Sequence, residues 1–185
     1  MEFDLKSRVL WKQVLGILMV TLGIVAISIY FPKTNSIAIG NGSPPITTGT
    51  ADTYGIQDAN GVFVSGSYAY IVTDNNSGAD PEFYIINIAS PGSPQIVGSY
   101  NVNVSVNKVY VAGDYAYLAT KKDAEDIVVL NITNKAQPTK VIGMNIPNNS
   151  QALTVSGAGS NLYVGFANSS TNPEFYVLSI SNPVA

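Results

Sequence analysis

Internal repetition constrains the fold of this chain more than any other feature of its sequence. The stretch "GVFVSGSYAYIVT" at residues 61–73 recurs as "KVYVAGDYAYLAT" at 108–120 and, more loosely, as "LTVSGAGSNLYVGF" at 153–166. Three tyrosines mark equivalent places in the copies, 47 and 46 residues apart: Tyr70, Tyr117 and Tyr163. A period of this length is typical of repeat architectures, in which each copy builds one structural unit.

Each copy contains short runs with the composition of β-strands. A pair of runs meets at a glycine, Gly66 or Gly113, and is followed by an aliphatic run such as "FYIINI" at 83–88 and by a proline-led run such as "SPQIVGSY" at 93–100. Alternation and β-branched content favour strands, and no segment after Pro32 has helical periodicity. Four antiparallel strands in about 46 residues is the size of one β-propeller blade.

The pattern "GSYAYIV…FYIINIASPGSPQIVG" resembles the LVIVD-type β-propeller repeat. Units of that family consist of a tyrosine hairpin, a hydrophobic strand that ends in Asp or Asn and Ser, and a closing strand led by proline. The resemblance covers most of residues 61–185, and the hairpin is degraded in the third copy. It implies blade units at about 61–105, 106–147 and 148–185.

The third copy stops at Ala185 without a proline-led run, whereas "SPPITTGT" at 43–50 aligns with that run of the first copy. Because circular closure removes exposed strand edges, we expect residues 45–50 to complete the third unit. The sequence thus predicts an all-β head over residues 43–185, a small three-bladed β-propeller of four-stranded blades. Two alternatives stay open: two chains that form a six-bladed ring, or donation of residues 45–50 to a neighbouring subunit.

An uncharged apolar run of eighteen residues lies near the N-terminus, from Val14 to Phe31. As a helix it spans about 27 Å, close to the thickness of a bilayer core. Three basic residues precede it, so the positive-inside rule keeps the N-terminus in the cytoplasm and places the head outside the cell. We predict a long hydrophobic helix over 1–32 and a linker over 33–42.

Three interpretations of this helix stay open. A cleaved signal peptide would use the small residues "AIS" at 26–28, although the apolar run is long for one. A permanent membrane anchor is the second interpretation. In the third, the segment resembles the N-terminal helix of type IV pilins in length, position and the acidic residues Glu2 and Asp4 near its start. Bacterial pilins carry glutamate at the fifth mature position, where this chain has Leu5.

The pilin resemblance implies a helix that first resides in the cytoplasmic membrane and then packs with copies of itself in a filament core. Gly16 and Gly23 lie seven residues apart, and small residues at that spacing let helices approach closely. We expect the following residues to form the assembly surface of the helix: Leu15, Gly16, Leu18, Leu22, Gly23, Ile24 and Ile27.

Composition argues against an enzyme and against nucleic-acid binding. The chain has no His and no Cys, which removes imidazole bases, thiol nucleophiles and the usual zinc ligands. Its carboxylates occur in loops of different units without a shared motif, which weakens the remaining hypothesis of an extracellular hydrolase. The net charge is −3, and no basic patch is dense enough to follow a phosphate backbone.

One loop has the ligand chemistry of calcium. Oxygen-bearing side chains alternate through "DNNSGADPE" at 74–82: Asp74, Asn76, Asp80 and Glu82. The loop lacks EF-hand spacing, so a solvated hairpin loop is the main expectation and calcium a weak candidate. We expect no other cofactor.

The chain also contains six Asn-x-Ser/Thr triplets, and Pro44 disfavours the first, at Asn41. The remaining candidate glycan acceptors are Asn75, Asn103, Asn131, Asn148 and Asn168.

The sequence favours a structural function, as a type IV pilin-like subunit of an extracellular filament whose partners are copies of itself. The alternative is a single-pass anchored propeller that binds a carbohydrate or protein ligand. Tyrosines of the hairpins are candidates for such a binding surface, although we expect alternate members to lie in the blade core.

Overall fold

The computed structural model describes residues 46–53, 57–75, 78–122, 124–146, 150–168 and 171–183. The helix predicted over 1–32, with all of its expected assembly residues, and the linker over 33–42 lie outside these ranges. Among the described residues, no helix has the length and apolar character needed to cross a membrane.

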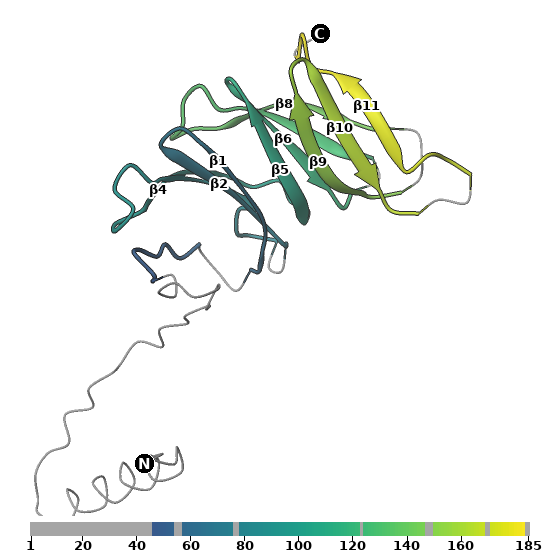
Figure 1. The fold of residues 1–185 in the computed structure, drawn as a ribbon. Helices are drawn as coiled ribbons and strands as arrows, with labels where there is room; N and C mark the ends of the chain where they lie inside the picture. The colour runs from purple at the N-terminus through teal and green to yellow at the C-terminus, as the bar shows by residue number, and fades with distance from the viewer. Residues whose placement is uncertain are drawn as a thin grey trace, which may run out of the picture. The chain divides into compact units, whose positions relative to one another are not determined.

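The described part of the chain consists of three antiparallel sheets (Figure 1). The first sheet has the order β1-β2-β3-β4: β1 (Ala59–Ser65), β2 (Tyr68–Thr73), β3 (Phe83–Asn87) and β4 (Gln95–Tyr100). The second has the order β5-β6-β7-β8: β5 (Val106–Ala112), β6 (Tyr115–Thr120), β7 (Ile127–Asn131) and β8 (Thr139–Met144). The third has the order β11-β10-β9: β9 (Ala152–Ala158), β10 (Asn161–Phe166) and β11 (Phe175–Ser179).

Glycine forms the tight turn between the first two strands of every sheet. Gly66, Gly113 and Gly159 have φ angles of 57°, 56° and 58°, in the left-handed region that favours glycine. The turns join strands in matching register, since Ser65 pairs with Tyr68 and Ala112 with Tyr115. These equivalent turns confirm that the sequence repeats correspond to structural repeats.

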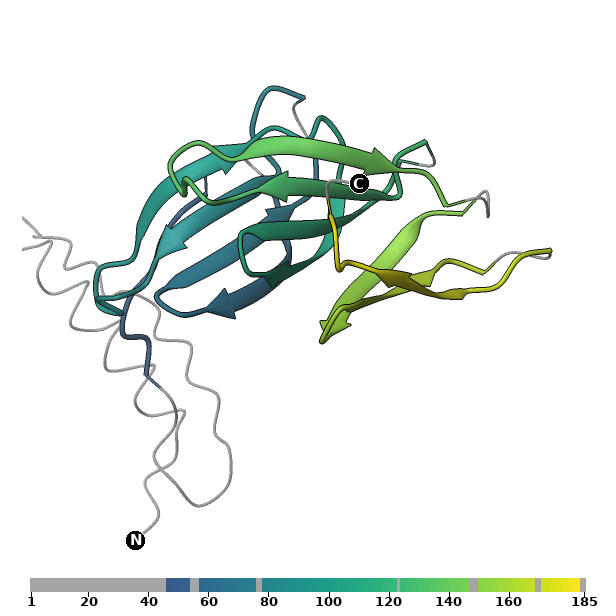
Figure 2. The same ribbon diagram turned by 90° about the horizontal axis from the view of Figure 1, so that it is seen from above.

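The three sheets follow one another in an arc, and their innermost strands β1, β5 and β9 are neighbours (Figures 1 and 2). One core lies between the first and second sheets, and a second core lies between the second and third. The first sheet contributes these residues to the first core: Tyr70, Val72, Phe83 and Ile85. The second sheet contributes the equivalent set to the second core: Tyr117, Ala119, Ile127 and Val129.

Strand alternation explains this stacking. Successive side chains of a strand point to opposite faces, so each buried strand supplies one core with its odd positions and the other with its even ones. In β7, Val128 and Leu130 belong to the first core, while Ile127 and Val129 belong to the second. The second sheet is therefore covered on both faces, as the near-continuous aliphatic run "IVVLNI" requires.

The prediction of a closed three-bladed propeller is wrong. Within the described residues the third sheet has three strands, and it lies at the opposite end of the arc from the first (Figures 1 and 2). Residues 46–53, which include most of the predicted closing strand 45–50, form no strand. The backbone at Gly49 lies close to Pro91 and Gly92, in the loop between β3 and β4 of the first sheet.

The error has a physical cause. Alternation and turn residues specify the strands within a unit, but the partner of an edge strand depends on the angle between units, which no local pattern encodes. The all-β class is correct, and the two four-stranded sheets fit the size and order of propeller blades.

Candidate assembly surface

A repeated polar contact links each sheet to the next. β1 and β5 each contain a bulge near the start of the strand, and an asparagine occupies it. Asn60 Nδ2 donates to the Val106 carbonyl at 3.0 Å, and Asn107 Nδ2 donates to the Ala152 carbonyl at 2.7 Å. In β9 the equivalent bulge residue is Leu153, which is exposed and whose side chain cannot donate a hydrogen bond. The third sheet therefore ends the series of polar links with an apolar side chain.

Replacing Asn107 by alanine is expected to lower the free energy of unfolding by about 1 to 2 kcal/mol, because the buried Ala152 carbonyl loses its side-chain donor. Urea unfolding followed by circular dichroism measures the change. Asn161→Ala, at an exposed position of β10, is the matched control and should stay within about 0.5 kcal/mol of the wild type. Equal free energies of unfolding for Asn107→Ala and Asn161→Ala would show that the hydrogen bond from Asn107 to Ala152 contributes nothing to stability.

Buried carboxylates hold the segments that leave the fourth strands. Glu82 and Asp126 occupy equivalent positions, just before β3 and β7, and both are fully buried. Glu82 Oε2 accepts from the backbone N–H groups of Val102 at 2.7 Å and Asn103 at 3.0 Å. Asp126 Oδ2 accepts from the N–H of Ile146 at 2.7 Å. Each acid thus fixes the chain where it passes to the next sheet.

Burial raises the pKa of Glu82, while hydrogen bonds from Val102 and Asn103 oppose that shift. Glu174 occupies the same place in the third unit. The backbone carbonyl of Glu174 accepts from the N–H of Phe166, and the backbone carbonyl of Glu82 accepts from the N–H of Thr73 in the same way. Glu174 is exposed. The acid is present in all three units, but in the third it faces solvent.

Two of the calcium candidates, Asp74 and Glu82, have separate hydrogen-bond partners. Asp74 Oδ1 lies 2.8 Å from Lys121 Nζ and accepts from Asn60 Nδ2 at 2.9 Å, and these bonds lower the pKa of Asp74. Glu82 Oε1 accepts from Asn75 Nδ2, and Asn76 lies outside the described residues. Within the described ranges, no three acidic side chains form a group that could hold a metal ion.

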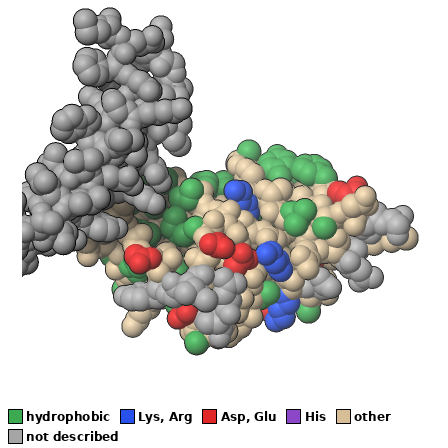
Figure 3. All heavy atoms as spheres, turned by 90° about the horizontal axis from the view of Figure 1, so that it is seen from below, with side chains coloured by type: hydrophobic (Ala, Val, Ile, Leu, Met, Phe, Trp, Pro, Cys, Tyr) green, Lys and Arg blue, Asp and Glu red, His purple; other side chains and the backbone are tan. Residues whose placement is uncertain are grey.

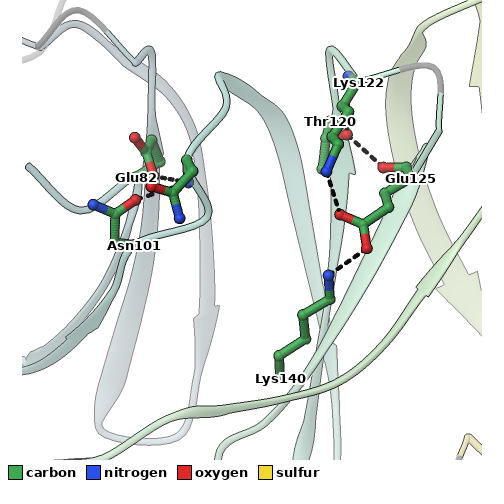
Figure 4. Close-up of polar contacts among 7 residues, drawn as sticks. Glu82, Asn101, Thr120, Lys122, Glu125 and Lys140 are labelled. Atoms are coloured by element: carbon green, nitrogen blue, oxygen red, sulfur yellow. Dashed lines mark hydrogen bonds and ion pairs between the residues drawn. The ribbon is translucent and has the colours of Figure 1, made fainter. Parts of the chain in front are cut away.

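Surface charges pair with one another. Glu125 accepts from Lys122 at 2.9 Å and from Lys140, which together lower the pKa of Glu125 (Figure 4). Acidic and basic side chains lie interspersed on the face shown in Figure 3. Partly exposed pairs of this kind contribute little to stability. They suit a solvated surface better than a site for an anionic polymer.

The outer face of the third sheet is apolar and exposed. Phe175 is 60% exposed and Val177 is 52% exposed. Their equivalents Phe83 and Ile85 in β3 are fully buried, and so are those in β7. Tyr163 of β10 stacks on Phe175 with ring centroids 6.1 Å apart. We call this face the candidate assembly surface, formed by Leu153, Tyr163, Phe175 and Val177.

The same sheet has an open edge within the described residues. β3 pairs with β2 and β4, and β7 pairs with β6 and β8. β11 pairs with β10 alone. An open edge next to an exposed apolar face is the usual appearance of a surface that binds another protein segment.

Two hairpin tyrosines, Tyr70 and Tyr117, are core residues, and burial raises the pKa of both.

Of the candidate glycan acceptors, Asn103 and Asn168 are exposed, and Asn148 lies outside the described residues. The side chain of Asn75 donates to Glu82, and that of Asn131 accepts from the N–H of Thr133. Glycosylation at these positions stays a prediction.

Taken together, the fold and this surface define an all-β protein built from repeated antiparallel units. The family model for the LVIVD repeat matches residues 56–102 and 105–145, which contain the first two units. No curated protein matches the chain significantly.

A solved structure, described as the crystal structure of the computationally designed Ika8 protein, is similar in fold, with a TM-score of 0.51 and 13% sequence identity. The similarity covers 75% of this chain and 38% of the designed one. At this identity the likeness concerns the fold alone, and the chain spans well under half of the designed protein.

Proposed function

We propose that this chain is a structural subunit of an extracellular filament. Its hydrophobic N-terminal segment packs with copies of itself in the filament core, and the repeat domain faces solvent. Before assembly the segment resides in the cytoplasmic membrane with its N-terminus in the cytoplasm. This proposal keeps the pilin-like interpretation, which rests on the sequence of residues 1–32.

The observation that carries the proposal is the candidate assembly surface on the third sheet. A row of large apolar side chains is exposed there, while the equivalent rows of the other two sheets form cores. Soluble monomers seldom leave such a face uncovered, whereas subunits of an assembly do. The buried acids and bulge asparagines serve internal hydrogen bonds, which is the use of polar residues expected in a structural domain.

Immunogold electron microscopy of cells that express the tagged full chain tests this proposal. We expect filaments labelled along their length. Leu22→Lys places a charge in the apolar helix, so it should abolish filaments because an unpaired ammonium is costly to bury. Lys33→Gln in the linker is the matched control and should leave them intact. Purification only as dispersed, detergent-solubilised monomers, with no labelled filaments, would contradict the proposal.

A second candidate function is ligand binding by a membrane-anchored repeat domain. A shallow hollow of about 360 Å³ lies between the turns of the second and third sheets, and Asp114, Tyr115 and Ser160 contribute to its lining. Its size is at the lower end for small-molecule sites, and its aromatic and polar lining suits a sugar ring. Glycan binding that is lost in Tyr115→Ala, on cells without filaments, would favour this candidate over the first.

A further inference from the structure

The hollow between the turns of the second and third sheets has an equivalent place between the first and second sheets. Tyr115, which lines the hollow, begins β6 as Tyr68 begins β2, and each ring packs at the margin of an inter-sheet core. Ile180 also lines the hollow, and it follows β11 as Ile132 follows β7. The two places therefore have the same backbone frame and can be compared residue by residue.

In the first of these places a lysine of the chain itself supplies a cation. Lys135 Nζ lies 5.8 Å from the centre of the Tyr68 ring and donates to the Ile132 carbonyl at 2.6 Å. An aromatic face and a carbonyl oxygen are both usual partners of an ammonium group. Lys135 is partly buried, whereas the other lysines of the described part of the chain are exposed.

A proline takes the position of this lysine in the third unit. Pro183 stands three residues after Ile180, as Lys135 stands three residues after Ile132. The ring of Pro183 carries neither a charge nor a hydrogen-bond donor. The hollow thus has the equivalents of both groups that hold the Lys135 ammonium, and the residue in the lysine position cannot supply the ammonium.

Asp114 gives the hollow its charge. It is the one charged residue among those that line the hollow, and Ser160 adds a hydroxyl group. The Asp114 side chain is exposed and forms no hydrogen bond or ion pair within the described ranges. A carboxylate, an aromatic face and a carbonyl oxygen all attract a cation.

We infer that this hollow binds an alkylammonium group, as carried by the lysine side chain of a partner polypeptide. The ammonium lies on the Tyr115 ring and donates to the Ile180 carbonyl, in the way that Lys135 uses the first place, and Asp114 supplies the opposite charge. The inference needs no filament. It shares only the place of the site with the second candidate function, and it names a cation instead of a sugar as the ligand.

NMR titration of the isotope-labelled full chain in uncharged detergent tests the inference. The probe is Nα-acetyl-lysine amide, and Nα-acetyl-norleucine amide is the matched ligand without an ammonium. We expect the lysine probe to shift the amide signals of Asp114, Tyr115 and Ser160 and to bind about tenfold more tightly than the norleucine probe. Added salt should weaken this binding, because salt screens the Asp114 charge. Tighter binding of the lysine probe than of n-butylammonium identifies a lysine side chain, and not a free amine, as the preferred source.

Substitutions in the hollow give an independent measurement. Asp114→Asn and Tyr115→Leu should each weaken binding of the lysine probe by at least about fivefold, because each removes one partner of the ammonium. Pro183→Lys should abolish binding, since the substituted side chain then fills the hollow as Lys135 fills the first place. Ser67→Ala, at the position of Asp114 in the first unit, is the matched control and should leave binding unchanged. Circular dichroism checks that each variant keeps the fold.

The converse substitution opens the first place. Lys135→Ala removes the internal ammonium, so the lysine probe should also shift the amide signal of Tyr68, which should not respond in the wild type. Thr139→Ala, at an exposed position of β8, is the matched control and should leave the Tyr68 signal insensitive to the probe.

Three results would overturn the inference. One is equal binding of the lysine and norleucine probes, which would show that the ammonium contributes nothing. Another is undiminished binding of the lysine probe to Pro183→Lys. The third is binding of methyl glucoside without binding of the lysine probe, which would favour the second candidate function. Labelled filaments made of a chain that binds no probe would refute the inference and leave the filament proposal intact.

Discussion

Replacing Phe83 by alanine is expected to lower the free energy of unfolding by about 3 to 5 kcal/mol, whereas Phe175→Ala should lower it by less than about 1 kcal/mol. The two residues occupy the same place in β3 and β11. Phe83 is fully buried between two sheets. Its ring stacks on the ring of Tyr70, with ring centroids 6.2 Å apart. Phe175 lies on the exposed outer face of the third sheet.

Urea unfolding of the full chain at low concentration in mild detergent, followed by circular dichroism, measures both changes. Because the substitution is chemically identical in the two variants, their difference reports the environment alone. At concentrations where copies associate, Phe175→Ala should reduce self-association while Phe83→Ala acts through the fold. A large loss of stability in dilute Phe175→Ala would show that the third sheet is covered within one chain.

Replacing Glu82 by alanine is expected to cost about 2 to 4 kcal/mol, whereas Glu174→Ala should change stability by less than about 0.5 kcal/mol. The carboxylate of Glu82 accepts from two backbone N–H groups, and its removal leaves Val102 and Asn103 without that acceptor. Glu174 is the exposed equivalent. A similar loss in both variants would contradict the structural role assigned to Glu82.

The pH dependence of Glu82 has a definite sign. Burial raises its pKa in the folded chain above the value of about 4.3 expected in the unfolded chain. The folded state therefore binds the proton of the Glu82 carboxyl more tightly than the unfolded state does. The resulting contribution to the free energy of unfolding is fully present below about pH 4.3 and is lost as the pH rises through the folded pKa. Glu82→Gln carries no titrating group. The stability of the wild type relative to Glu82→Gln should fall with rising pH, and a rise would refute the assignment.

Much of each unit was predictable from local signals. The sequence predicted that two strands meet at Gly66 and at Gly113, and in the structure both glycines form turns with left-handed φ angles between strands. Tyr70 and Tyr117 are buried, as the alternation within each hairpin predicted. These features depend on residues only a few positions apart, so a pattern in the sequence is enough to identify them.

The polar residues of the interfaces were not identified from the sequence. Glu82 was assigned to a loop as a candidate metal ligand, because its backbone partners at residues 102–103 lie beyond two further strands, β3 and β4. A signal existed, since an acid directly precedes the aliphatic run in every unit: Glu82, Asp126 and Glu174. Asn60 and Asn107 also recur at one position, 47 residues apart. Both asparagines donate hydrogen bonds to the next sheet, and this role is visible only in the tertiary structure.

The sequence by itself determined that the chain after residue 60 forms β-units with a period of about 46 residues, because strand alternation, turn chemistry and repetition are local properties. Only the tertiary structure decided that the described units form an arc and that the outer face of the third sheet is exposed. The equivalent residues Phe83 and Phe175 show why, since the same side chain at the same place in the repeat is buried in one unit and exposed in another. Burial depends on the sheet that lies opposite, and no residue within a unit specifies whether that sheet is present.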